Sequence, residues 1–100
     1  RYFARNGGVV TAGADAGAGF HLFGFGFIRE LEMHVEAGFS PLETVRHATA
    51  NSAAVLGEEK LGKIRPGWVA DLILVEGNPI ADFKRLYGAF GPAGSGVRWT

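Results

Sequence analysis

The chain has 100 residues, no cysteine, and ten basic against ten acidic side chains. It is too short for a complete (β/α)8 barrel, which takes about 200 to 250 residues, and the lack of cysteine excludes disulfides and cysteine-ligated zinc. The balanced charge argues against a nucleic-acid partner, no uncharged stretch approaches the length of a membrane span, and the composition leaves the compartment open.

The first elements of the chain are short. Residues 1–5 fit the end of a helix. Residues 9–12 are apolar and mostly β-branched and follow the turn-forming sequence Asn6-Gly7-Gly8. Such a run is typical of a strand that is buried on both faces, as in a parallel sheet. We therefore expect a buried strand at residues 9–12.

Apolar side chains at helical spacing predict a helix over residues 27–38. They are Phe27, Ile28, Leu31 and Val35. Gly38 is the expected left-handed residue after the helix, and Phe39 is expected to pack on Met33 as part of that cap.

A second helix is predicted to begin at Ser40, with Pro41 in its first position and Glu43 completing a capping box. Asn51 is expected to interrupt this helix and to cap a short third turn that ends at Gly57. The inner face of the helix is expected to carry three residues: Leu42, Val45 and Thr49.

The pattern changes after residue 60. A turn is predicted at residues 65–67 (Arg-Pro-Gly), an apolar strand at 70–75 and a helical turn at 80–87. A loop rich in glycine and alanine follows at 88–96, and residues 97–100 resemble the start of a strand. The sequence therefore predicts an α/β arrangement up to about residue 60 and β structure after it.

Asp15 is the main candidate for chemistry. It follows the predicted strand and lies among small residues, in Gly13-Ala14-Asp15-Ala16-Gly17. Parallel sheets and barrels place ligands at the carboxyl ends of their strands, and a carboxylate can bind a cation or accept a proton. On position alone, an aspartate that caps a turn or the next helix is the commoner outcome.

The three histidines are spaced by thirteen residues, and none of the pairs has the short spacing of metal-binding histidines. His21 lies in the glycine-rich stretch after Asp15 and is a candidate substrate-binding residue. His34 is expected to pair with Glu30 on a polar helix face, and His47 is expected on the outer side of its helix.

Nine short motifs follow one another along the chain. They are Gly13-Ala14-Asp15-Ala16-Gly17, Arg29-Glu30-Leu31-Glu32 with Glu36-Ala37-Gly38-Phe39, Ser40-Pro41-Leu42-Glu43, Ala48-Thr49-Ala50-Asn51, Leu56-Gly57, Leu61-Gly62-Lys63-Ile64, Arg65-Pro66-Gly67, Ala70-Asp71-Leu72 and Gly77-Asn78-Pro79. Each motif is weak alone. In this order, over residues 7–87, they resemble the C-terminal part of the metal-dependent amidohydrolase superfamily, in its imidazolonepropionase- and prolidase-like branch.

The resemblance implies an α/β fold, with the C-terminal end of a (β/α)8 TIM-barrel amidohydrolase, its last strand and helices, in residues 1–58. Residues 59–100 would supply strands of a composite β-sandwich, truncated in this chain. Asp15 would end the eighth barrel strand, ligate a divalent metal that is typically zinc (one or two ions), and pass a proton from the attacking water to the leaving nitrogen. The other ligands would lie upstream of this chain.

Some family features are missing from this sequence. Ala14 stands where members usually have Thr or Ser, and Trp68 stands where lysine is common. The histidines of the family's first, fifth and sixth strands and its bridging carboxylate or modified lysine would lie upstream. Asp15 alone supplies one ligand where a catalytic zinc takes about three from protein, so the isolated chain is expected to be inactive and to need the rest of the barrel.

Two classes of function remain open. One is a hydrolase of carbon–nitrogen bonds that acts on a small-molecule amide or a dipeptide, and a deaminase-type amidohydrolase would share its architecture. The other is a stand-alone, non-catalytic α/β module used for binding or structure. A His-x-His motif after an upstream strand would favour the enzyme.

Overall fold

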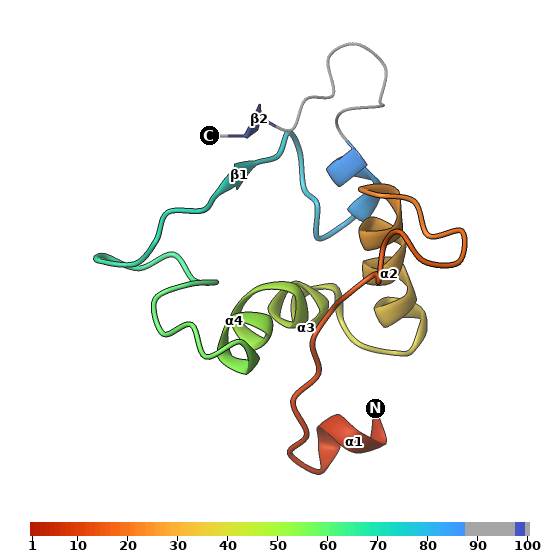
Figure 1. Cartoon of the computed structure of the whole chain (residues 1–100), viewed down its shortest axis with the longest axis horizontal. Helices are drawn as coiled ribbons and strands as arrows, with labels where there is room; N and C mark the ends of the chain where they lie inside the picture. Colours follow the sequence, from red (N-terminus) through yellow and green to blue (C-terminus); the bar gives the residue numbers. More distant parts are fainter. Residues whose placement is uncertain (88–97, 100) are drawn as a thin grey trace.

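The computed structural model describes residues 1–87 and the backbone of residues 98–99, and its longer helices lie close to one another (Figure 1). In chain order the elements are helix α1 (Tyr2–Arg5), helix α2 (Phe25–Glu36), helix α3 (Pro41–Arg46), the π-helical turn η1 (His47–Asn51), helix α4 (Ser52–Val55), strand β1 (Ile73–Leu74), the 3-10 helix η2 (Phe83–Tyr87) and strand β2 (Arg98–Trp99). None of the described helices is long and apolar enough to cross a membrane.

Helix α2 forms in the predicted region but begins and ends two residues earlier than the predicted range 27–38, and the predicted glycine follows its end. Gly38 has φ +94°, and the amide of Phe39 donates to the carbonyl of His34 at 3.2 Å, as in a Schellman motif. The ring of Phe39 lies against the rings of His34 and His47, with centroids 6.0 Å and 4.7 Å apart. Met33, its expected partner, is 49% exposed.

The capping box at the start of α3 is confirmed. The Ser40 hydroxyl accepts from the Glu43 amide at 3.2 Å, and the Glu43 carboxylate accepts from the Ser40 amide at 2.7 Å. Pro41 occupies the first helical turn. The bonds from Ser40 lower the pKa of Glu43 because they favour its ionised form. This helix start is fixed by local chemistry, which the sequence shows directly.

The inner face of α3 differs from the predicted one. Thr44 and His47 are buried, at 0% and 5% exposure, whereas Leu42 is 64% exposed and Thr49 is exposed. Only Val45 of the three expected residues packs against the core. Apolar spacing indicates that one face is buried but does not say which face the neighbouring helix selects. Here α3 and η1 turn the face that carries His47 toward α2.

The predicted interruption near Asn51 takes the form of a π-turn rather than a new cap. The turn η1 continues directly from α3 into α4, so the three form one continuous helical rod over residues 41–55, called the α3 rod below (Figure 1). The Asn51 side chain makes no capping bond and donates instead to the carbonyl of Val10. Gly57, with φ +78°, follows the end of the rod as predicted.

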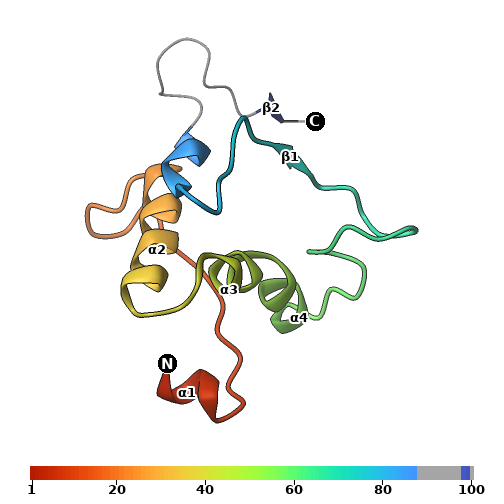
Figure 2. The ribbon, with the colours of Figure 1, turned by 180° about the vertical axis from the view of Figure 1, so that it is seen from behind.

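The core lies between α2, η2 and the α3 rod. Its buried members are Ile28, Leu31 and Phe83. The rings of Phe25 and Tyr87 lie 5.4 Å apart, so η2 packs along α2, an arrangement also visible from behind in Figure 2. Ala12 and Val45 pack at the edge of this cluster, which places the segment before Asp15 beside both long helical elements.

The buried strand expected at residues 9–12 does not form in the structure, so this prediction was wrong. The segment is extended but belongs to no ladder among the described residues, and Val9 is 56% exposed. A strand needs neighbours that bond its amides and carbonyls. In their place, the α3 rod supplies partners to Val10 and Ala12.

The second half of the chain forms less regular structure than predicted. The strand expected at residues 70–75 is reduced to β1, which pairs antiparallel with β2 through Ile73–Trp99 and Leu74–Arg98. β2 falls within the strand expected at 97–100, the loop expected at 88–96 lies outside the described residues, and the helical turn expected at 80–87 is η2. The described structure is thus mostly helical, with one two-stranded ladder in place of an α/β sheet.

Candidate active site

Asp15 lies on the surface where the extended segment turns into a glycine-rich loop. Its φ of +47° is in the left-handed region, which is uncommon for a residue with a side chain and is found often at functional sites. The Asp15 carbonyl accepts from the Ala18 amide at 3.4 Å, which closes a turn. The carboxylate makes no hydrogen bond or ion pair with any residue that the structure describes, so its oxygens are available to a ligand.

Two hydrogen bonds hold the segment that leads to Asp15. The Asn51 amide nitrogen Nδ2 donates to the Val10 carbonyl at 2.8 Å, and the Ala12 amide donates to the His47 carbonyl at 3.3 Å. In Figure 1 this segment runs from α1 past the α3 rod toward α2. The end of the segment is therefore tied to the turn η1.

His21 lies in the same loop as Asp15 but faces another feature. Its carbonyl accepts from the Gly17 amide at 3.1 Å, and its side chain lines an open groove of about 310 Å³. Met33 and Tyr87 also line this groove, and Asp15 does not. The structure therefore places the two predicted site residues on one loop, with Asp15 outside the groove that His21 lines.

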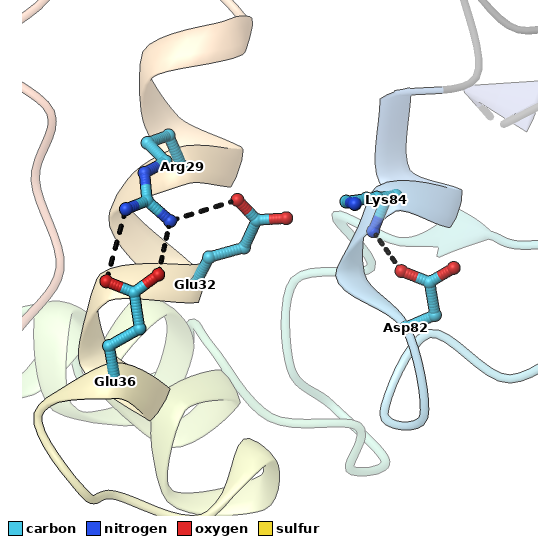
Figure 3. Close-up of polar contacts among 5 residues, drawn as sticks. All are labelled: Arg29, Glu32, Glu36, Asp82 and Lys84. Carbon is cyan, nitrogen blue, oxygen red and sulfur yellow. Dashed lines mark hydrogen bonds and ion pairs between the residues drawn. The ribbon is translucent and has the colours of Figure 1, made fainter.

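Arg29 also borders the groove, but its charge is already engaged. Figure 3 shows its guanidinium bonded to the carboxylates of Glu36 at 2.6 Å and 3.1 Å and of Glu32 at 3.4 Å. The bond to Glu36 raises the pKa of Arg29 and lowers that of Glu36. Nearby in the same view, Asp82 accepts from the Lys84 amide at 3.0 Å at the start of η2. These contacts stabilise the two helices. Because the Arg29 guanidinium is already bonded to two carboxylates, its charge is not available to a ligand in the groove.

A histidine pair joins α2 to η1, and the sequence analysis missed it. The His34 and His47 Nδ1 atoms lie 2.8 Å apart, and His34 Nε2 lies 3.2 Å from the Glu30 carboxylate. The Glu30–His34 pair forms as predicted but is partly buried rather than on an open polar face, and His47 is buried rather than on the outer side of its helix. Burial and then the charge of His34 lower the pKa of His47, while Glu43 raises it. The available signal was two helices joined by a short turn, because two such helices pack against each other and can bring their histidines together.

The described residues hold no group of three or more histidine, cysteine, aspartate or glutamate side chains that could enclose a metal ion. Asp15 is nevertheless suited to be one ligand, because it presents a free carboxylate at the surface. A complete metal site would need donors in addition to those of Asp15.

The comparisons with known proteins decide the family. The sequence profile described as "Amidohydrolase family" matches residues 4–94. The chain belongs to the amidohydrolase family. This confirms the resemblance drawn from the nine motifs.

Two relatives show how this family member compares with longer proteins. It is 41% identical over 58 residues to the ochratoxinase of Aspergillus niger. This match covers 55% of this chain and 12% of the ochratoxinase. It is similar in structure to a prolidase-like protein from Bifidobacterium longum, with a TM-score of 0.81 and 34% identity over 100% of this chain and 25% of that one. The amidohydrolase chain therefore spans an eighth to a quarter of these relatives.

Proposed function

We propose that this chain is the C-terminal part of a metal-dependent hydrolase that acts on carbon–nitrogen bonds of a small-molecule amide or dipeptide. Membership of the amidohydrolase family and the likeness to an ochratoxinase and a prolidase-like protein support the reaction class. Residues 1–58 would be the last strand and helices of the barrel, and residues 59–100 would be part of the composite β-sandwich. The extended form of residues 9–12 supports this division, since such a segment can join a sheet.

One observation carries the proposal. Asp15 follows the extended segment directly, in a left-handed conformation, with a carboxylate that no described side chain engages. A carboxylate at the carboxyl end of a barrel strand is where this architecture places catalytic groups. The small residues on both sides, Ala14 and Ala16, leave space for a substrate and a metal to approach.

Asp15 would hold a divalent metal as one oxygen ligand, and the remaining ligands would come from upstream of residue 1. A bound divalent ion of this kind brings the pKa of water toward neutrality and polarises a carbonyl. The Asp15 carboxylate would accept the proton of the attacking water and return it to the leaving nitrogen. His21, on the neighbouring groove, would contact the substrate.

Replacing Asp15 by asparagine tests the assignment in the longer protein that contains this chain. The amide keeps the shape of the side chain but cannot accept the proton and is a poorer ligand. We expect turnover of amide and dipeptide substrates to fall by at least about a hundredfold, while circular dichroism and the melting temperature stay near the wild-type values.

Asp71→Asn is the matched control, because Asp71 is also an exposed aspartate and lies two residues before strand β1. It is expected to keep wild-type turnover. Full activity in Asp15→Asn would remove Asp15 from the catalytic role. Absence of any hydrolysis or deamination in the folded wild-type protein would favour the non-catalytic module, and release of ammonia from an amino-substituted ring would favour a deaminase.

A further inference from the structure

The turn η1 holds the segment before Asp15 at two points. Asn51 Nδ2 donates to the Val10 carbonyl at 2.8 Å, and the Ala12 amide donates to the His47 carbonyl at 3.3 Å. Val10 and Ala12 are two residues apart in an extended segment, so these backbone groups lie along the same edge. Asn51 and His47 thus bond the same backbone groups of the segment that a neighbouring strand would bond.

The residues that make this contact belong to a π-helical turn or flank it. In a π-turn the backbone bond runs to the fifth residue along instead of the fourth, and such turns are rare and frequent at functional sites. The Ser52 hydroxyl also donates to the His47 carbonyl, at 2.6 Å. This carbonyl is therefore fixed from its own helix while it accepts the bond from Ala12.

A second segment, the loop that contains Gly62, also contacts η1. A Cβ at Gly62 would lie 2.7 Å from the Thr49 carbonyl oxygen and 3.1 Å from Ala50 Cα, so the two backbones are in close contact. His47 is buried and Asn51 is half-buried. The turn thus contacts both the extended segment and the loop after α4, and its position constrains the segment.

We propose that Asn51 is a positioning residue for Asp15. This rests on the proposed function of Asp15. Asp15 lies three residues beyond Ala12, and its carboxylate has no partner among the described side chains, so the backbone before it sets its place. A displacement of about 1 Å at a reacting group can cost about a hundredfold in rate. Asn51 acts through the Val10 carbonyl and touches neither substrate nor metal.

The test compares Asn51→Asp and Asn51→Gln in the longer protein that contains this chain. Asn51→Asp keeps the size of the side chain but presents an acceptor to the Val10 carbonyl, and Asn51→Gln keeps the amide on a longer stem. We expect kcat to fall about 10- to 100-fold in Asn51→Asp with KM within about twofold, and to fall less in Asn51→Gln. The affinity for Zn²⁺, measured by titration of the metal-free protein, is expected to weaken in the same order.

Asn6→Asp is the matched control. The Asn6 amide also donates to a backbone carbonyl at 2.8 Å, that of Tyr2 within α1, away from the turn η1. It is expected to keep wild-type kcat and Zn²⁺ affinity, which separates the effect on Asp15 from the loss of one such bond.

Unchanged kcat and Zn²⁺ affinity in folded Asn51→Asp would overturn the positioning role while Asp15→Asn remains inactive. Failure of both Asn51 variants to fold would also overturn it, because Asn51 would then act on stability alone. If Asp15→Asn itself is active, the proposed function fails instead, so the two failures are distinct.

Discussion

His47 is the residue whose environment departs most from the one predicted. Its ring is buried beside those of His34 and Phe39, the Glu30 carboxylate contacts His34, and the charge of Glu43 acts on His47. At 2.8 Å one Nδ1 must donate and the other must accept, so the two rings cannot both carry a proton on Nδ1. The pair therefore joins α2 to η1 best when at least one ring is neutral.

The joint between His34 and His47 predicts a pH-dependent stability. The pKa of His47 is lowered from 6.5 in the folded state, first by burial and then by His34. The unfolded chain then binds more protons near that pH, so the stabilisation is complete above about pH 6.5 and is lost as the pH falls through it. We expect the urea midpoint to decrease between about pH 7.5 and about pH 5.

His47→Asn removes the titrating ring and should flatten this part of the pH profile. His21→Asn is the control, because it also replaces a histidine but leaves the His34–His47 pair intact. Equal slopes in wild type and His47→Asn would show that the histidine pair does not govern the pH dependence.

At the scale of elements, the close contact between the loop after α4 and the turn η1 is the feature most open to test. Gly62 has φ +80° and lies against the Thr49 carbonyl, whereas Gly67 has φ +78° and open space around it. Because both glycines have a positive φ, replacing either by alanine strains its own backbone by about 1–2 kcal/mol. Only at Gly62 would the added methyl group also collide with the backbone of Thr49.

Gly62→Ala is therefore expected to lower the free energy of unfolding more than Gly67→Ala, by about 1 kcal/mol or more. Chemical denaturation of the two variants side by side measures the difference. Equal losses would mean that the loop and η1 are not in contact in solution.

The helix ends could be predicted from the sequence because their chemistry is local. Ser40 and Glu43 bond across three residues, and Gly38 supplies a conformation that its neighbours cannot adopt cheaply. The bond from Asn51 to Val10 spans 41 residues and needed the structure. The strand at residues 9–12 was predicted for the same local reasons, but a strand forms only with neighbours, and the described residues supply helix groups instead.

On the scale of the whole molecule, large apolar side chains remain exposed on every part of the described chain outside the core. Examples are Phe3, Phe23, Leu56 and Leu74, all more than half exposed. Exposed apolar groups in this number mark surfaces that other parts of a protein cover. The chain also spans only 25% of the prolidase-like protein that it matches along its whole length. Both observations support its proposed place as one part of a larger hydrolase.

The metal affinity of that larger protein tests the central claim most directly. Zn²⁺ would be titrated into the metal-free wild type, Asp15→Asn and Asp71→Asn, each with its folded state checked by circular dichroism. If Asp15 is a ligand, Asp15→Asn binds Zn²⁺ at least about tenfold more weakly and Asp71→Asn binds it as the wild type does. Equal Zn²⁺ affinity in all three proteins would contradict the claim.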